Sequence, residues 1–291
     1  MSSSPIAPRR FAVVAHPKIA EAVVLAAEIA EFLTARGAHA HHGLLQEEDL
    51  ASQLRRGGFD LLIALGGDGT MLRAGHLCAG SQVPILGINL GRFGFLTEVR
   101  PDEWSGVLDR VLAGDYWIER RMMLRAQHNA ADGPTQSEWD ALNECVVGRG
   151  EVVRPVHLTA EIDGRYLTTY VADALIAATP TGSTAYALAA GGPILPPTLR
   201  NILLVPVAPH LSVDRAIVLD EGSSVRLTVH TDHQATLSVD GHPPQRMSDG
   251  ESVEVRAAEH SANFVRLQDP GYFYRNLTSR MNQNPSIGAE R

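Results

Sequence analysis

The sequence has few cysteines, few aromatic residues and no long apolar run. Cys78 and Cys145 are the only cysteines among 291 residues, and their separation is not typical of a metal site. We therefore expect reduced thiols and a cytoplasmic protein. No apolar stretch approaches the roughly 18–20 residues that a transmembrane helix requires. Residues 1–5 also lack the basic-then-apolar pattern of a secretory signal, so we expect no association with a membrane.

Basic residues are outnumbered by acidic ones. The 25 Lys and Arg against 33 Asp and Glu give a formal charge of −8. This balance argues against broad electrostatic binding to nucleic acid or to anionic lipid. It does not exclude a small anionic ligand, because helix N-termini bind phosphate locally. The apolar fraction of 44% is that of a globular protein, and the length fits about two domains.

The first part of the chain alternates apolar runs with helical patterns. This alternation predicts crossover connections and an α/β domain with an open, mainly parallel sheet. Gly37 follows the first helical pattern at a position typical of a helix end. The expected strands span residues 11–15, 60–65 and 84–89, and the expected helices span residues 19–36, 71–79 and 102–112.

The pattern changes after residue 114, where short apolar runs follow one another closely. Asp163-Gly164 separates two such runs and predicts a two-residue hairpin, because type I′ turns need positive φ at both central positions. This part predicts an all-β domain, as a sandwich or as stacked sheets. The expected runs span residues 156–162, 165–171, 175–178, 202–205, 216–219, 225–230, 235–239, 253–257 and 264–267. We place the α/β domain at 1–118 and the β domain at 119–267, with a partly helical 268–291 packing back on the first domain.

A glycine-rich loop follows the second expected strand directly. It consists of Gly66, Gly67, Asp68 and Gly69, and a helical pattern comes after it. Glycines allow positive φ and close approach of a ligand, and the following helix N-terminus favours phosphate. An aspartate at such a site could hold Mg²⁺ or accept a proton from an attacking hydroxyl. The alternative is a tight turn in which Asp68 caps the helix, since the motif matches neither a Walker A loop nor the dinucleotide fingerprint.

Two further polar segments are candidates for ligand binding. Residues 179–186 carry four small hydroxyl residues, a glycine and Tyr186, a pattern that suits either ligand contacts or a capped helix entry. Asn143 and Glu144 interrupt an apolar run, which fits either a site or an ordinary strand edge, and Asp173 is similarly ambiguous. The clustered histidines lack the spacing of zinc ligands, so we expect them to be exposed.

Together these motifs resemble the bacterial-type NAD kinase family. The resemblance rests on the glycine-aspartate loop, residues 87–97, Asn143-Glu144 and residues 179–186 followed by 191–193, in that order. It implies transfer of the γ-phosphoryl group of ATP to the 2′-hydroxyl of the adenosine ribose of NAD, with Mg²⁺ as the divalent metal. It also implies two domains with NAD between them, and a homodimer or homotetramer.

The resemblance also implies roles for individual residues. Asp68 matches the proton acceptor, and Asp173 matches a carboxylate that binds the ribose on the nicotinamide side. Arg154 matches a basic contact from a neighbouring subunit. The complete set of implied substrate and cofactor contacts is Gly66, Gly67, Asp68, Gly69, Arg73, Asn143, Glu144, Arg154, Val171, Asp173, Thr184, Ala185, Tyr186, Ala187, Leu188, Ala189, Ala208 and His242.

Two positions depart from the family pattern. Val171 stands where some members carry arginine, and His242 stands where some carry glutamine. Both match the nicotinamide end, which leaves the preference between NAD and NADH open. The sequence separately leaves open whether polyphosphate also serves as the phosphoryl donor. A glycine-aspartate loop also occurs in diacylglycerol and sphingosine lipid kinases, so a lipid kinase is one alternative. A non-catalytic dinucleotide sensor is the other.

Overall fold

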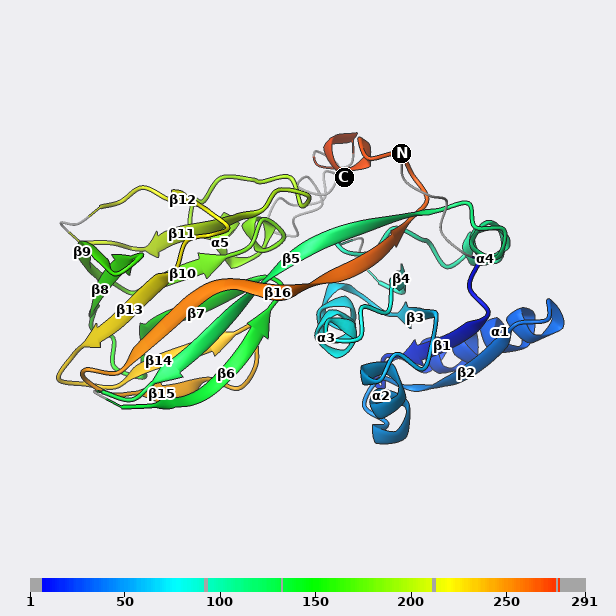
Figure 1. Cartoon of the computed structure of the whole chain (residues 1–291), viewed down its shortest axis with the longest axis horizontal. Helices are drawn as coiled ribbons and strands as arrows, with labels where there is room; N and C mark the ends of the chain where they lie inside the picture. The colour runs from blue at the N-terminus through cyan, green and yellow to red at the C-terminus, as the bar shows by residue number, and fades with distance from the viewer. Residues whose placement is uncertain (1–6, 92–93, 132, 211–212, 276, 278–291) are drawn as a thin grey trace, which may run out of the picture. The chain divides into compact units, whose positions relative to one another are not determined.

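The computed structural model describes residues 7–91, 94–131, 133–210, 213–275 and 277. The chain forms two compact units, Met1–Arg120 with Ala262–Arg291, and Arg121–Ser261. Two long strands, β5 (Trp117–Asn129) and β16 (Ser252–Arg266), pair with each other, and each has residues in both units (Figure 1).

The first unit contains the predicted parallel sheet. Its strands are ordered β2 (His39–Leu44), β1 (Arg10–Ala15), β3 (Leu61–Leu65) and β4 (Ile85–Ile88), all parallel. The end of β16 joins next to β4. Every residue of β3 is buried, as expected for a strand in a sheet that is covered on both faces.

Four labelled helices accompany this sheet in the described part of the first unit, and residues 272–275 are also helical. Helix α1 (Ala20–Ala35) buries a stripe of small and branched residues, and Gly37 follows it with a φ of 77°, as predicted. The others are α2 (Glu48–Arg55), α3 (Asp68–Cys78) and α4 (Trp104–Leu112). The sequence patterns missed β2, which is too polar to give an apolar run, and the short helix α2.

The second unit is built from antiparallel strands that enclose one apolar core. One sheet has the order β12 (Ile217–Asp220), β11 (Asn201–Val207), β10 (Ala174–Ala178), β7 (Glu144–Arg149), β14 (Ala235–Val239) and β15 (Gln245–Met247). The strands that face this sheet across the core are β13 (Val225–His230), β8 (Val156–Ile162), β9 (Arg165–Ala172) and β6 (Thr135–Ala141), together with parts of β16 and β5. The hairpin between β8 and β9 is confirmed, with φ of 53° at Asp163 and 72° at Gly164.

Two strands that were expected to be separate form one continuous strand, β16. Residues 253–257 and 264–267 were expected as separate runs, but β16 passes through both without a break. The intervening residues contain neither glycine nor proline, so nothing in them ends a strand. The sequence patterns also missed β5, because charged Glu119 and Arg121 are buried in it and hide its apolar character.

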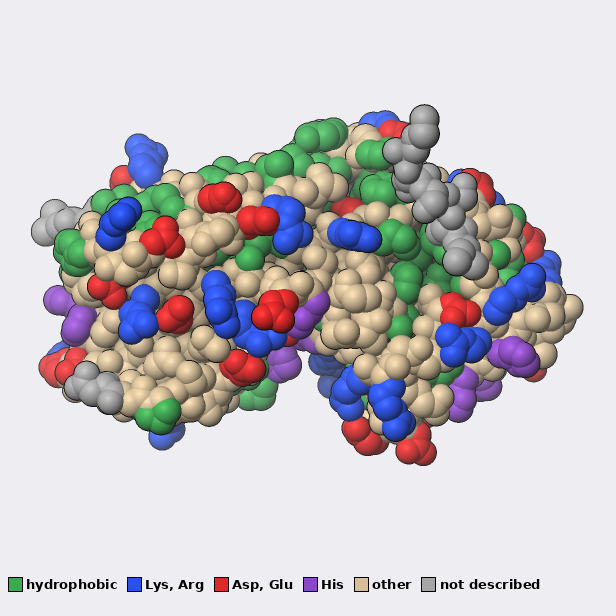
Figure 2. Space-filling view, viewed as in Figure 1, with side chains coloured by type: hydrophobic (Ala, Val, Ile, Leu, Met, Phe, Trp, Pro, Cys, Tyr) green, Lys and Arg blue, Asp and Glu red, His purple; other side chains and the backbone are tan. Residues whose placement is uncertain are grey.

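Figure 2 shows acidic and basic side chains interspersed over the face in view. No helix among the described residues is long and apolar enough to cross a membrane.

Candidate functional site

The glycine-aspartate loop joins β3 to α3 in the first unit. At Gly66 a Cβ would lie 2.2 Å from Thr70 Oγ1, so the fold itself requires glycine there. At Gly67 and Gly69 a Cβ would have no atom within 4 Å, and neither residue has positive φ. Of the three glycines, only Gly66 is therefore required by the packing of the turn itself. The open space beside two of them suits close approach of a ligand.

The carboxylate of Asp68 is held by another segment of the same unit. Its Oδ2 accepts a hydrogen bond from the Phe95 amide at 2.7 Å, and its Oδ1 accepts one from the Leu96 amide at 3.1 Å. Gly67 occupies the N-cap position of α3, and no side chain caps the helix. The alternative in which Asp68 caps α3 is therefore wrong. The implied contact Arg73 is exposed on the same helix.

In the second unit, Asp240 organises the segment that carries Asn143 and Glu144. Its carboxylate accepts hydrogen bonds from three consecutive amides, those of Leu142 at 2.6 Å, Asn143 at 2.9 Å and Glu144 at 2.8 Å. Asp240 itself has a φ of 44°, in a turn that continues through Gly241 to His242. Sequence analysis missed this role, although Asp240-Gly241 is the same turn signal as Asp163-Gly164.

The loop at 179–186 packs against that segment. The Thr179 amide donates to Asn143 O at 2.8 Å, and the Thr179 hydroxyl donates to Leu142 O at 2.5 Å. At Gly182 a Cβ would lie 2.2 Å from Asn143 O, so this contact requires glycine. The two motifs, far apart in sequence, thus form one structural element. It continues through the short helices η1 (Gly182–Thr184) and α5 (Tyr186–Ala189), which carry Thr184, Tyr186, Ala187, Leu188 and Ala189, with Ala185 between them.

Most hydroxyl groups of this loop form hydrogen bonds with backbone groups of the protein. Thr179 also accepts the Gly182 amide, Ser183 Oγ donates to Pro180 O, and Thr184 Oγ1 donates to Thr181 O. Only Thr181 Oγ1 is buried with no partner among these four hydroxyls. Three of the four hydroxyls therefore already donate hydrogen bonds to backbone carbonyls of the protein.

Glu144 is a carboxyl group in an unusual environment. Burial, and secondly the nearby charge of Asp240, raise the pKa of Glu144 to about 8, although the Tyr186 amide donates to it and opposes the shift. Its Oε2 is buried and has no hydrogen-bond partner in the structure. At neutral pH the carboxyl is therefore mainly protonated and can donate a hydrogen bond.

This environment predicts that Glu144 makes the protein less stable as pH rises. Between the ordinary glutamate pKa of 4.5 and the folded pKa of about 8, the folded chain holds up to one proton more than the unfolded chain. The free energy of unfolding then falls with a slope of up to about 1.4 kcal/mol per pH unit, and the loss is complete above the folded pKa. Denaturant unfolding from pH 5 to 9 should show this slope in the parent and a shallower one in Glu144→Gln. The exposed Glu259→Gln is the control, and parallel curves for parent and Glu144→Gln would contradict the assignment.

Asp173 and Ala208 lie close together at the neighbouring strand ends of β10 and β11. The Asp173 amide donates to Val207 O at 3.0 Å, and Ala208 follows with a φ of 46°. The Asp173 carboxylate pairs with Arg149, with 3.2 Å between Oδ1 and Nε. A ligand that binds this carboxylate must compete with Arg149 or share it.

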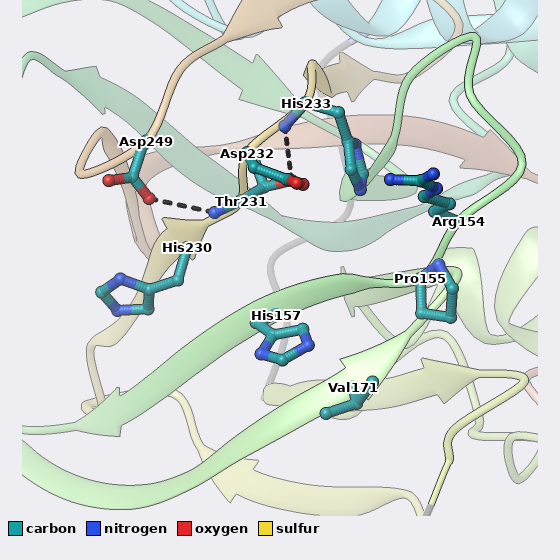
Figure 3. A pocket seen from close by; sticks show the side chains of 9 residues that line it. All are labelled: Arg154, Pro155, His157, Val171, His230, Thr231, Asp232, His233 and Asp249. Atoms are coloured by element: carbon teal, nitrogen blue, oxygen red, sulfur yellow. Dashed lines mark hydrogen bonds between the residues drawn. The ribbon is translucent and has the colours of Figure 1, made fainter.

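Arg154 and Val171 line one pocket of about 750 Å³ in the second unit (Figure 3). Three histidines share it: His157 from β8, His230 at the end of β13, and His233 just after it. Figure 3 shows the His233 and Arg154 side chains next to each other, and the Thr231 amide donating to Asp249 at 2.9 Å. His230 and His233 are neighbours in sequence, whereas sequence analysis did not place His157 beside them because it lies far away in the chain.

No metal centre is formed by the protein's own side chains in the described part of the chain. There, no group of three or more His, Cys, Asp or Glu residues has an arrangement that could hold an ion.

Comparison with known proteins assigns both units to one family. The model of the ATP-NAD kinase N-terminal domain matches residues 11–116, and that of the ATP-NAD kinase C-terminal domain matches residues 142–267. The chain is 36% identical over 277 residues to an NAD kinase of Dehalococcoides mccartyi, covering 95% of this chain and 97% of that protein. It is 44% identical over 236 residues to the NAD kinase of Heliobacterium modesticaldum, covering 81% and 82% respectively.

Solved structures agree with this assignment. The yeast NADH kinase complexed with NADH has a TM-score of 0.79 at 25% identity, covering 98% of this chain and 91% of that one. An NAD kinase from Archaeoglobus fulgidus in complex with ATP has a TM-score of 0.73 at 26% identity, covering 96% and 100%. The α/β and all-β domains predicted from sequence are confirmed, and the chain belongs to the NAD kinase family.

Proposed function

We propose that this chain transfers the γ-phosphoryl group of ATP to the 2′-hydroxyl of the adenosine ribose of NAD and so forms NADP. Family membership supports the kinase activity and its substrates. The main structural support for phosphoryl transfer is the carboxylate of Asp68, which two backbone amides hold in place. It lies beside two glycines with open space and beside a helix N-terminus that no side chain caps. Amides at such a helix start favour phosphate.

Asp68 acts as the proton acceptor in this proposal. A carboxylate offers about four acceptor positions, and the amides of Phe95 and Leu96 occupy two. The remaining lone pairs can take the proton of the ribose hydroxyl while its oxygen bonds to the γ-phosphorus and the bond to the ADP oxygen breaks. Positioning of this kind supplies most of the catalysis in phosphoryl transfer.

The other implied residues bind the substrates in this proposal. Asn143 and Glu144 hold the dinucleotide, with Glu144 as a hydrogen-bond donor when protonated. Asp173 binds the second ribose. Its carboxylate pairs with Arg149 in the structure, so it must leave Arg149 or be shared with it when the ribose binds. The remaining contacts are proposed for Gly66, Gly67, Gly69, Arg73, Arg154, Val171, Thr184, Ala185, Tyr186, Ala187, Leu188, Ala189, Ala208 and His242.

We further propose that Mg²⁺ accompanies ATP. Magnesium is usually bound by substrate phosphates with one or two carboxylates, which fits a described structure without a dedicated metal cluster. When bound it neutralises charge on the phosphates. Chelation with excess EDTA is therefore expected to lower NADP formation by at least about 100-fold, and added Mg²⁺ is expected to restore it. Full activity after exhaustive chelation would contradict a metal requirement.

The proposed assembly is a homodimer or homotetramer in the cytoplasm. Val153 is 81% exposed, next to Val152 and the exposed Arg154, and an apolar pair of this kind is better covered by a second subunit. The expected free thiols are confirmed: Cys78 and Cys145 are unpaired and buried. Burial raises the pKa of the Cys78 thiol to about 12, so it is inert.

One assay separates this function from its alternatives. Purified protein is incubated with NAD or NADH, Mg²⁺, and ATP or polyphosphate, and NADP(H) is detected with an NADP-specific enzyme. NADP formation with ATP is the expected result. The NADH arm measures the preference that Val171 and His242 leave open, and the polyphosphate arm measures whether polyphosphate can replace ATP. Transfer of labelled phosphate to a lipid but not to NAD would indicate a lipid kinase. Tight NAD binding without turnover would indicate a sensor.

A further inference from the structure

A buried arginine lies behind the segment that holds Asp68. The side chain of Arg266, near the end of β16, is 1% exposed. Its Nε donates to Glu119 Oε2 at 2.5 Å, and the Tyr272 hydroxyl donates to the same oxygen at 2.8 Å. Glu98 is a second carboxylate near this guanidinium, with 3.8 Å between its Oε2 and Arg266 Nη1. All four residues belong to the first unit.

Arg266 also reaches the backbone of Leu96. Its Nη1 donates to Leu96 O at 3.0 Å, while the Leu96 amide donates to Asp68 Oδ1 at 3.1 Å. One residue therefore connects the guanidinium on one side to the carboxylate on the other. The Leu96 amide and carbonyl belong to two peptide planes that meet at the Leu96 Cα. Holding the carbonyl therefore limits the movement of Leu96 as a residue and, through it, the movement of its amide.

The carboxylate and this segment are in close contact. At Gly94 a Cβ would lie 2.0–2.2 Å from all three atoms of the Asp68 carboxyl group. A small shift of the segment would therefore move the carboxylate, lose one of its amide hydrogen bonds, or both. Misplacement of a catalytic group by about 1 Å can lower a rate by roughly 100-fold.

Packing alone does not call for an arginine at this place. A buried ion pair is often no more stable than apolar side chains of similar volume. Here Arg266 Nη2 and Glu98 Oε2 are buried without a hydrogen-bond partner, so the charges are incompletely satisfied. What an apolar side chain could not supply is the hydrogen bond to Leu96 O.

We propose that Arg266 is a positioning residue for phosphoryl transfer, which acts by holding Leu96 so that the amides of Phe95 and Leu96 orient Asp68. This inference rests on the proposed role of Asp68 as proton acceptor. It assigns to Arg266 no contact with either substrate.

Arg266→Lys tests the proposal, because lysine keeps the charge beside Glu119 but lacks the planar fork that reaches the carboxylate and the carbonyl together. We expect kcat to fall at least about tenfold, with the KM for NAD changed less than twofold. Arg110→Lys is the matched control, since Arg110 also bridges a carboxylate, that of Asp115, and a backbone carbonyl, Leu267 O, in the same unit. It should keep the parental kcat.

A double-mutant cycle separates positioning from a general structural role. In the Asp68→Asn background, Arg266→Lys should change the residual kcat less than twofold, because the group that it orients is gone. An equal loss in both backgrounds, or a parental kcat for Arg266→Lys, would overturn the proposal. If Asp68→Asn itself retains parental turnover, the proposed function of Asp68 fails, which is a separate result.

Amide hydrogen exchange measured by NMR gives a readout that does not need activity. In Arg266→Lys, the Phe95 and Leu96 amides should exchange hydrogen at least about tenfold faster than in the parent, because local opening becomes easier. The amides of β1 and β3 should keep their parental rates. Unchanged exchange at Phe95 and Leu96 would show that Arg266 does not hold the segment, and a uniform increase would indicate general destabilisation.

Discussion

Asp68→Asn is expected to lower kcat by about 10²–10⁴-fold, the usual contribution of a general base. Asparagine has nearly the shape of aspartate but cannot take the proton of the ribose hydroxyl. Its single carbonyl oxygen can accept the Phe95 or the Leu96 amide, while its own NH₂ group faces the other amide. We therefore also expect a modest loss of order in residues 94–96, with the KM for NAD within about threefold of the parent.

The measurement is initial-rate kinetics with NAD and ATP varied separately. Asp109→Asn is the matched control, because Asp109 forms an exposed ion pair with Arg36 in the same unit, and such pairs contribute little. Unfolding curves of both variants show whether the fold persists. Near-parental kcat in Asp68→Asn would remove Asp68 from the role of proton acceptor, whereas a large KM effect with unchanged kcat would make it a binding residue.

Local patterns predicted those parts of the fold that depend on local physics. Helix α1 could be predicted because its apolar stripe and Gly37 mark its face and its end. The Asp163-Gly164 turn could be predicted because few residue pairs adopt positive φ twice. Strand β5 could not, since Glu119 is buried in it and is satisfied by Arg266, a residue 147 positions away.

The candidate site likewise has parts that a local sequence pattern predicts and parts that it does not. The glycine-aspartate loop has a local signal, because a strand, a turn and a helix start meet within a few residues. The partners of Asp68 and of Asn143 have none: Leu96 lies 28 positions from Asp68, and Asp240 lies 97 positions from Asn143. Contacts at such separations depend on the tertiary fold, which no short pattern encodes.

Both units fix a polar segment in the same way. In the first, the Asp68 carboxylate binds two consecutive amides, and in the second the Asp240 carboxylate binds three. Such bonds set the backbone before a ligand arrives, which reduces the entropy that binding must overcome.

Gly182→Ala is the second change with a large expected effect. The added Cβ would lie 2.2 Å from Asn143 O and 2.6 Å from the carbonyl carbon, and both are backbone atoms with little freedom to yield. The Asn143 side of this contact is held by the three hydrogen bonds to Asp240. Relief therefore requires either the loop at 179–186 or the 142–144 segment to move. We expect the free energy of unfolding to fall by about 1–3 kcal/mol, as for other overpacked sites.

The same substitution should weaken binding of NAD more than it slows turnover. Asn143 and Glu144 are proposed to hold the dinucleotide, so their displacement is expected to raise the KM for NAD about tenfold or more, with kcat within about threefold. Gly222→Ala is the matched control, since its Cβ would meet no atom within 4 Å, and its unfolding free energy should stay within about 0.5 kcal/mol of the parent. If the two variants behave alike in kinetics and in unfolding, the packing of Gly182 against Asn143 does not hold the substrate-binding segment in place.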